Sequence, residues 1–299
     1  MKKKAAIIGA GQIGKALGTI LEQKGVSVFF WDKDPAKAPG RLELAEIVKD
    51  AVALFLCIPS WANREALQAI KPHLNPKTIV VTLSKGIELD SRKTMDAVLA
   101  ETLPSGQPYA VMGGPMMAKE MEQGRRAIAA IGASSKSAFT KLTKLFEGTL
   151  LIMEYQRDIR SVALAGVLKN IYSFFLGMSD ALNWGGNVKG WLAQEALKEM
   201  AEVAKTLGMK KDAMYGTAGL GDFIGTAFSP YSRNRQAGEE VIKTGQCCLP
   251  TEGVNALPSV IALLGESAKD FLILNMLRRI IIGKEKAEAV LEELFKNNQ

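Results

Sequence analysis

A strand, a glycine-rich turn and a helix follow one another at the start of the chain, and this order limits the fold more than any other feature. Ala5–Ile8 is a short apolar run typical of a buried strand, and Lys15–Lys24 has the spacing of an amphipathic helix. Between them, Gly9–Gly14 reads GAGQIG, in which the first glycine permits a tight turn, the second admits a pyrophosphate, and the third lets helix and strand pack closely. The free N–H groups and the dipole of a helix start favour phosphates. The turn therefore predicts a dinucleotide site with these contacts: Gly9, Gly11, Gln12, Ile13 and Gly14.

The residues after the second expected strand bear on which dinucleotide binds. Val26–Trp31 is that strand, and Asp32 follows it at the distance, roughly 20 residues after the glycine turn, at which an acid holds the ribose hydroxyls. This position favours NAD. Lys33 comes next and could instead attract a 2′-phosphate, so NADP stays open as the alternative.

Strand and helix patterns alternate through the first half of the chain. Further strands are expected at Ala51–Ile58, Thr78–Leu83, Tyr109–Met112, Arg126–Ile131 and Leu150–Met153, and helices at Trp61–Ile70 and Lys136–Phe146. Such alternation predicts a Rossmann-like, doubly wound parallel sheet over residues 1–155. Ligands bind at the carboxyl edge of such a sheet, where Pro59 and Lys85 follow two of the strands. On its own, a loop lysine is more often simply exposed.

Long helical patterns replace this alternation after about residue 155. Helices are expected at Ser161–Leu182, Val188–Leu207, Glu239–Lys243, Ala256–Gly265 and Lys284–Lys296. Residues 156–299 are therefore predicted to form an all-α domain that follows the α/β domain.

Lys169 is flanked by apolar residues within the first of these helices. Burial of a lysine is costly and favours its neutral form. A lysine whose stem packs while its head reaches water would explain the same pattern. The neighbouring Asn170 favours a functional lysine, which could exchange a proton with an alcohol or carbonyl oxygen. The single histidine, His73, lies in a turn-like segment between prolines and is a poor candidate for that role.

Glycines, a carboxylate, a hydroxyl and two arginines gather in a short stretch of the second half. Gly219–Thr226 reads GLGDFIGT, and Ser232–Arg235 reads SRNR. Glycines let a backbone approach a ligand, and guanidinium groups match the oxygens of a phosphate or carboxylate. Read alone, the stretch fits a ligand-binding loop or a solvated basic turn, and the turn is the commoner case.

Charge and cysteine content exclude several classes of protein. The net charge is +7, but the basic residues are dispersed, which argues against nucleic-acid binding. Three cysteines provide no disulfide framework and no zinc-ligand spacing, as expected for a protein of a reducing compartment. The apolar run after the N-terminal lysines is too short for a signal peptide, and charges interrupt the later apolar segments. We therefore expect a cytoplasmic protein with no membrane span and no metal site.

In this order, the motifs resemble the NAD(P)-dependent glycerol-3-phosphate dehydrogenases of the soluble, bacterial type. The resemblance extends along nearly the whole chain. It rests on Gly9–Gly14, Ile58-Pro59-Ser60, Ser84–Glu88, Gly114-Pro115, Leu168-Lys169-Asn170, Gly219–Thr226, Ser232–Arg235 and Glu252-Gly253. Many dehydrogenases share the glycine turn, whereas the lysine–asparagine pair followed by the two later motifs is far more specific.

The resemblance implies an activity and a role for individual residues. Members reduce dihydroxyacetone phosphate reversibly to sn-glycerol 3-phosphate with NAD(P)H, which supplies glycerol phosphate for phospholipid synthesis. The implied catalytic residues are Lys169, Lys85 and Asp222. Lys169 would transfer the proton, Lys85 would contact substrate and cofactor, and Asp222 would help to hold the lysines and the substrate hydroxyl. The implied substrate contacts are Lys85, Gly114, Asn170, Asp222, Thr226, Ser232, Arg233 and Asn234. The implied cofactor contacts, beyond the glycine turn, are Asp32, Lys33, Pro59, Lys85, Ala118, Arg233 and Glu252. A homodimer is a further expectation.

The chain departs from the family pattern at several positions. Met116-Met117 stand where a small polar residue and an aromatic residue are usual, and Gln12-Ile13 replace a serine and an aromatic residue. Two alternatives therefore remain open: a related reductase of another phosphorylated or carboxylated hydroxy acid, and a non-catalytic dinucleotide-binding regulatory protein. Retention of four residues together argues against the second: Lys85, Lys169, Asp222 and Arg233.

Overall fold

The computed structural model describes residues 2–38 and 42–296 of the chain. It divides into two compact units, of which the first comprises Met1–Glu88 and Lys93–Ala163, and the second Leu89–Arg92 and Leu164–Gln299. The functional division predicted at residue 155 stays a prediction.

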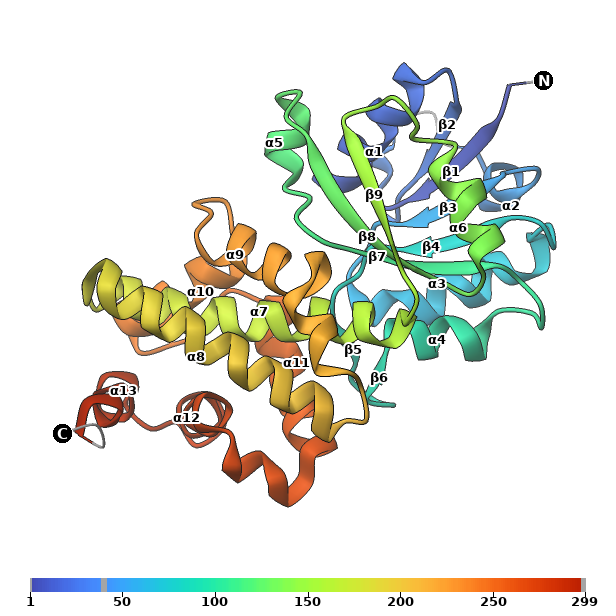
Figure 1. The fold of residues 1–299 in the computed structure, drawn as a ribbon. Helices are drawn as coiled ribbons and strands as arrows, with labels where there is room; N and C mark the ends of the chain where they lie inside the picture. The colour runs from blue at the N-terminus through green and yellow to red at the C-terminus, as the bar shows by residue number, and fades with distance from the viewer. Residues whose placement is uncertain (1, 39–41, 297–299) are drawn as a thin grey trace. The chain divides into compact units, whose positions relative to one another are not determined.

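The first unit contains a seven-stranded sheet with the strand order β2-β1-β3-β4-β7-β8-β9 (Figure 1). Its strands are β1 (Lys4–Ile8), β2 (Ser27–Trp31), β3 (Ala53–Leu56), β4 (Ile79–Thr82), β7 (Tyr109–Gly113), β8 (Ala127–Ala133) and β9 (Leu151–Gln156). The Rossmann-like fold class is confirmed. One pairing differs from the expected all-parallel sheet: β8 pairs antiparallel with β7, and β9 then runs parallel to β8.

Both faces of the sheet are covered, which explains the near-continuous apolar strands. Successive strand residues point to opposite faces, and all four residues of β3 and of β4 are buried. One face packs against α1 (Gln12–Gln23), α5 (Ala118–Glu122) and α6 (Lys136–Thr143) in a single hydrophobic cluster. The other helices of this unit are α2 (Leu44–Val48), α3 (Asn63–Ile70) and α4 (Met95–Thr102), and α3 packs on α4.

Short elements complete the first unit. A two-stranded antiparallel sheet joins β5 (Ile87–Glu88) and β6 (Lys93–Thr94). Single helical turns lie at η1 (Pro35–Lys37), η2 (Ser60–Ala62) and η3 (Lys71–His73). The carboxyl ends of β1, β3 and β4 lead directly into Gly9, the Cys57–Pro59 segment and Leu83–Lys85, so three predicted site segments leave the same edge of the sheet.

The second unit is helical, as expected. Its helices are α7 (Ile159–Ala181, of which the residues from Leu164 belong to this unit), α8 (Gly185–Thr206), α9 (Asp222–Ala227), α10 (Arg233–Thr244), α11 (Glu252–Leu264), α12 (Leu272–Ile281) and α13 (Ala287–Lys296). Shorter turns form η4 (Lys211–Tyr215), η5 (Thr217–Gly221) and η6 (Gly265–Asp270). Within the described residues, α7 alone is long and apolar enough to cross a membrane, but its apolar window is entirely buried inside the protein, as in a core helix.

Two expectations about the second unit were wrong in detail. The glycine stretch is helical rather than a loop, because η5 continues into α9. Helix α10 begins at Arg233, six residues before the expected start at Glu239, because the Ser232 hydroxyl accepts the Arg235 N–H and caps the helix. Helix α12 was not expected at all.

Candidate functional site

The glycine turn has the backbone geometry that the sequence predicts for a dinucleotide site. Gly9 has φ +101°, and a Cβ there would lie 2.5 Å from the Cys57 carbonyl oxygen. A Cβ on Gly14 would lie 2.1 Å from the Gly9 carbonyl oxygen, whereas one on Gly11 would meet nothing within 4 Å. Helix α1 has no side-chain cap and no acid in its first turn. Gln12 and Ile13 lie in the first turn of this helix. The glycine turn and the start of the helix therefore leave room and N–H groups for a pyrophosphate.

Asp32 lies beside this turn. Its carboxylate accepts the Ala10 N–H at 2.8 Å and the Asp34 N–H at 2.9 Å. These contacts fix the carboxylate next to the glycine turn, where a ribose would follow the pyrophosphate. Lys33 is exposed and adjacent.

Cys57 also borders the turn, but its chemistry excludes a nucleophilic role. Although the residue is partly exposed, burial of its thiol raises the pKa of Cys57 to about 12. The thiol therefore stays protonated at neutral pH.

A buried amide organises the segments after β3 and β4. Asn63 donates to the Ser84 hydroxyl at 2.8 Å and to the Pro59 carbonyl at 3.0 Å, and accepts the Thr82 hydroxyl at 2.9 Å. Asn63 was not among the predicted residues, because a lone asparagine carries no local signal and the Thr82 and Ser84 hydroxyls lie 19 and 21 residues further along the chain. The network positions Lys85, which follows Ser84 directly.

Lys85 and Gly114, both predicted substrate contacts, are brought together in the first unit. The Lys85 ammonium group donates to the Gly114 carbonyl oxygen at 2.8 Å, and Gly114 has φ +98°. Met116 is buried in the hydrophobic cluster of this unit, so its side chain packs inward. Ala118 begins α5 two residues later.

The second unit contains a buried lysine–carboxylate pair. Lys169 on α7 is 6% exposed and Asp222 on α9 is 2% exposed. The Lys169 ammonium lies 3.2 Å from the Asp222 carboxylate and donates to the Thr226 hydroxyl at 2.8 Å. A hydrogen-bonded ion pair at such depth keeps a charged lysine stable where an unpaired one would be strongly disfavoured. The three predicted residues therefore form one group.

Asn170, the next residue of α7, begins a chain of amide contacts. The Asn234 amide donates to the Asn170 side-chain oxygen at 2.9 Å, and the Asn234 side-chain oxygen accepts the Gly253 N–H at 3.0 Å. Glycine is required at position 253, because a Cβ would lie 2.5 Å from the Asn170 carbonyl oxygen. These contacts tie α7, α10 and α11 together and hold Asn170 and Asn234 adjacent.

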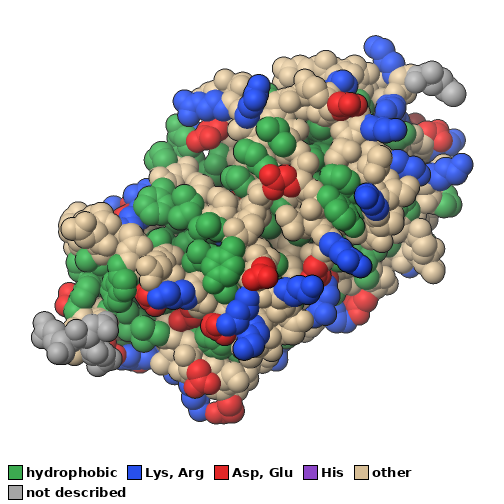
Figure 2. All heavy atoms as spheres, in the orientation of Figure 1, with side chains coloured by type: hydrophobic (Ala, Val, Ile, Leu, Met, Phe, Trp, Pro, Cys, Tyr) green, Lys and Arg blue, Asp and Glu red, His purple; other side chains and the backbone are tan. Residues whose placement is uncertain are grey.

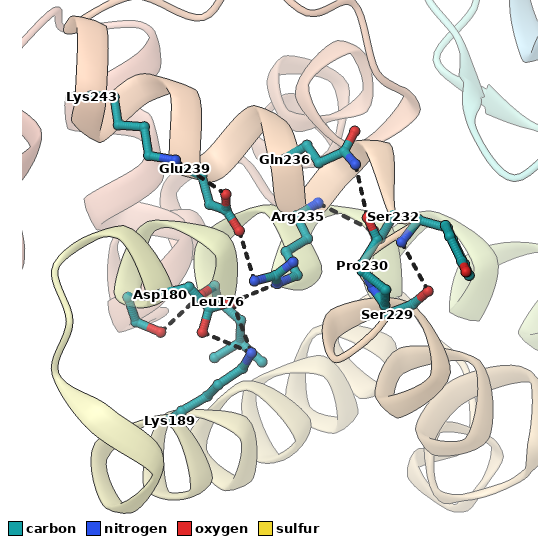
Figure 3. Close-up of polar contacts among 12 residues, drawn as sticks. Leu176, Asp180, Lys189, Ser229, Pro230, Ser232, Arg235, Gln236, Glu239 and Lys243 are labelled. Atoms are coloured by element: carbon teal, nitrogen blue, oxygen red, sulfur yellow. Dashed lines mark hydrogen bonds and ion pairs between the residues drawn. The ribbon is translucent and has the colours of Figure 1, made fainter.

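An ion-pair network fixes the start of α10 against α7 (Figure 3). Arg235 donates to Asp180 at 2.6 Å and pairs with Glu239 at 2.7 Å, and Lys189 also pairs with Asp180 at 2.8 Å. Helices α7 and α10 approach closely at two glycines: a Cβ on Gly177 would lie 2.0 Å from the Arg235 carbonyl oxygen, and one on Gly238 equally close to that of Phe174. Arg235 thus positions the N-terminus of α10.

Three predicted anion contacts stand at that N-terminus. Ser232 is the buried cap, Arg233 is exposed at the first helical position and donates to the Pro250 carbonyl oxygen at 3.4 Å, and Asn234 follows. Glu252 lies at the first position of α11, beyond the cap formed by Thr251. A helix start bearing an arginine favours an anion.

Glu199 on α8 is a second polar anchor in this unit. Its carboxylate accepts the N–H groups of Ile273 and Leu274 at the start of α12, and the hydroxyl of Tyr172 at 2.9 Å. Burial raises the pKa of Glu199, and burial with the nearby Glu199 charge raises the pKa of Tyr172. Tyr172 lies one helical turn after Lys169, so the contact braces the helix that carries the lysine.

No group of three or more His, Cys, Asp and Glu side chains in the described ranges could hold a metal ion. On the face drawn in Figure 2, Lys and Arg side chains stand among Asp and Glu side chains rather than in one continuous patch. That face gives no support to a nucleic-acid surface.

Comparison with known proteins identifies the family. The model of the NAD-dependent glycerol-3-phosphate dehydrogenase C-terminus matches residues 158–292, and that of the N-terminus matches residues 39–139. The chain is 34% identical to the glycerol-3-phosphate dehydrogenase [NAD(P)+] of Carboxydothermus hydrogenoformans, over 79% of this chain and 77% of that protein. The chain belongs to the NAD(P)-dependent glycerol-3-phosphate dehydrogenase family.

Other members of the glycerol-3-phosphate dehydrogenase family match over their full length. The protein named glycerol-3-phosphate dehydrogenase [NAD(P)+] 2 of Sphingopyxis alaskensis is 28% identical to this chain, over 100% of this chain and 98% of the relative. The crystal structure of the glycerol-3-phosphate dehydrogenase from Coxiella burnetii has a TM-score of 0.87 at 26% identity, and covers 98% of this chain and 99% of that one. The resemblance found in the sequence is therefore confirmed, whereas the roles of the individual site residues stay predictions.

Proposed function

We propose that this chain reduces dihydroxyacetone phosphate to sn-glycerol 3-phosphate with NADH or NADPH, and catalyses the reverse oxidation. The observation that carries the proposal is the buried group of Lys169, Asp222 and Thr226, together with the anion-favouring start of α10. Family membership supports the substrate, the cofactor class and the reversible chemistry.

The glycine turn fits the dinucleotide, because Gly11 leaves open space and α1 offers uncapped N–H groups. When bound, the reduced cofactor supplies a hydride from C4 of its nicotinamide. Asp32 would hold the adenosine ribose and favour NAD over NADP. Pro59, Ala118, Lys33, Arg233 and Glu252 are the remaining proposed cofactor contacts.

Lys169 would donate a proton to the C2 oxygen as the carbonyl becomes an alcohol, and accept it in the reverse direction. The Asp222 carboxylate and the Thr226 hydroxyl hold the ammonium group in place for this transfer. Lys85 would add positive charge beside the developing alkoxide.

The phosphate of the substrate would bind at the start of α10. Ser232, Arg233 and Asn234 offer a hydroxyl, a guanidinium and an amide there, and the helix dipole adds to their attraction. Asn170 and Gly114 would contact the rest of the substrate. The inward-packed side chain of Met116 gives no reason to prefer another hydroxy acid.

The test is a direct assay. The purified protein is mixed with dihydroxyacetone phosphate and either NADH or NADPH, and the loss of reduced-nicotinamide absorbance is followed. We expect turnover with both cofactors and faster turnover with NADH. If neither NADH nor NADPH supported turnover, the proposal would be contradicted.

The physiological setting is also a proposal. A product of this kind supplies the backbone of glycerophospholipids, and the buried position of the apolar helix α7 supports a cytoplasmic enzyme. A homodimer is proposed for the helical unit, and the molar mass in solution tests it.

A further inference from the structure

A lysine-rimmed pocket lies at the amino edge of the sheet in the first unit, opposite the edge that carries the glycine turn. It has a volume of about 410 Å³, and Lys3, Lys77, Lys141, Lys144, Val52 and Leu145 line it. We call it the amino-edge pocket. Pockets of this size accommodate small organic ligands.

The four lysines have no ion-pair partner among the described residues. Lys3 precedes β1, Lys77 precedes β4, and Lys141 and Lys144 lie at the end of α6. All four are exposed, and Asp50 is the one carboxylate on the rim. Four ammonium groups around one cavity repel each other, so a bound anion would relieve their repulsion.

The walls of the pocket are apolar. Val52 leaves 38% of its surface exposed, and Ala51, Ile79 and Leu145 lie behind the rim. Asn75 adds a polar group on the rim: its side-chain oxygen accepts the Lys77 N–H at 2.9 Å, which leaves its amide N–H groups for a ligand. An apolar wall beneath a cationic rim fits a molecule with both characters.

We propose that the amino-edge pocket binds a small amphipathic anion, a molecule with a phosphate or carboxylate head on an aliphatic or aromatic body. The head pairs with the lysines and Asn75, and the body covers Val52 and Leu145. The site is separate from the dinucleotide site, because β1 with its five residues spans roughly 15 Å between the two edges. Both ligands therefore bind at once.

Isothermal titration of the full-length protein, saturated with NADH, tests the proposal with three probes. Octyl phosphate is expected to bind more tightly than inorganic phosphate, and its affinity is expected to fall with added salt. Octanoate distinguishes a preference for a phosphate head from one for a carboxylate head. Equal affinities for octyl phosphate and inorganic phosphate would overturn the amphipathic assignment, and absence of binding by all three would overturn the site.

Charge-matched variants locate the binding. The double variant Lys77→Gln with Lys141→Gln is expected to lower the affinity for octyl phosphate at least about tenfold, since each lysine contributes a charge-assisted contact. Lys71→Gln with Lys136→Gln is the control, because both lysines are exposed, lie in the same unit and do not line the pocket. An equal loss of affinity in the control variant would mean that the effect comes from the net charge alone, and would overturn the proposal.

A third variant tests the apolar wall. Val52→Ser is expected to lower the affinity for octyl phosphate and to leave the affinity for inorganic phosphate unchanged, because it removes only apolar surface that the octyl chain covers. Competition between octyl phosphate and NADH or dihydroxyacetone phosphate would place the probe in the reaction site and contradict the pocket. Because binding is measured without turnover, this result is independent of the proposed reaction.

Discussion

Lys169 is stabilised by two groups that arrive from another helix, and this explains how a charge persists at 6% exposure. We expect Lys169→Met to lower kcat about 100- to 10 000-fold, the usual contribution of a positioned acid. The same variant leaves the buried Asp222 without that cation, which costs about 3–5 kcal/mol of stability.

Lys169→Met with Asp222→Asn separates chemistry from folding. The double variant should recover most of the lost thermal stability, because no buried charge remains, and should still bind NADH but not turn over. Steady-state kinetics, melting temperature and NADH titration supply the three readouts. Near-normal turnover in the double variant would show that the proton comes from elsewhere.

Asp32 is the residue on which cofactor choice is expected to depend. Its carboxylate is held beside the glycine turn by the Ala10 N–H, so a 2′-phosphate there would meet a fixed negative charge. Asp32→Asn should lower the NADH-to-NADPH ratio of kcat/KM by about tenfold or more. Lys33→Gln is the companion variant, which should lower kcat/KM for NADPH and leave kcat/KM for NADH unchanged. A wild-type enzyme that strongly prefers NADPH would mean that Lys33 dominates.

At the scale of elements, the approach of α7, α10 and α11 depends on Gly253. A Cβ there would lie 2.8 Å from the Asn234 side-chain oxygen as well as against α7, so the helices must separate. Gly253→Ala should cost about 1–3 kcal/mol of stability and raise KM for dihydroxyacetone phosphate. Gly190→Ala on α8 is the control, since a Cβ there meets nothing within 4 Å, and it should stabilise by up to about 1 kcal/mol. Matching effects of the two substitutions would refute this explanation.

Glu199 couples the stability of α12 to pH. Its folded pKa is raised above the ordinary value of 4.5, chiefly by burial, so the folded protein holds this proton at pH values where the unfolded chain has released it. The free energy of unfolding should therefore fall as pH rises from 4.5 through the raised pKa, by about 1.4 kcal/mol for each unit of the shift.

Glu199→Gln removes this titration and provides the comparison. The difference in unfolding free energy, wild type minus variant, should decline with rising pH over that window when measured by urea denaturation. A difference that is independent of pH would mean that the carboxyl ionises equally in both states. Loss of one acceptor at the start of α12 changes the offset between the curves but not their slope.

The elements were predictable where a local pattern determined them. The glycine turn follows from steric limits on a few adjacent residues, and the apolar strands follow from burial on both faces of a sheet. The antiparallel pairing of β7 and β8 was not predictable, because strand direction depends on connections and leaves no mark on the local pattern. The start of α10 differs from the prediction because Ser232, predicted as a ligand contact, also caps the helix.

The site was predictable for residues that carry chemistry and not for those that position them. Lys169 stands out as a charge in an apolar helix, and Asp222 and Arg233 stand out within a dense motif. Asn63 contacts Ser84 and Arg235 contacts Asp180 across 21 and 55 positions of the chain, and those contacts exist only after folding. Glu199 likewise caps a helix that begins more than 70 residues later.

At the scale of the whole molecule, each compact unit has a buried core of its own. The first unit contains the glycine turn, Asp32, Pro59 and Lys85, whereas the buried lysine and the start of α10 belong to the second. The division assigns most proposed dinucleotide contacts to one unit and most proposed substrate contacts to the other.

The first unit should therefore bind the dinucleotide alone. We expect a fragment of residues 1–163 to fold cooperatively and bind NADH with an affinity reduced only by the loss of Arg233 and Glu252. The backbone of Ile159 packs directly against Gly132 of β8, where a Cβ would lie only 2.6 Å from the Ile159 Cα. The fragment must therefore extend beyond β9 to include Ile159. Circular dichroism and NADH fluorescence measure folding and binding.

Gly11→Val in the same fragment is the control: Gly11 faces open space, so the valine should leave the fold intact while occupying the room for the pyrophosphate. A folded fragment that fails to bind, or a valine variant that binds equally well, would remove the dinucleotide from this turn.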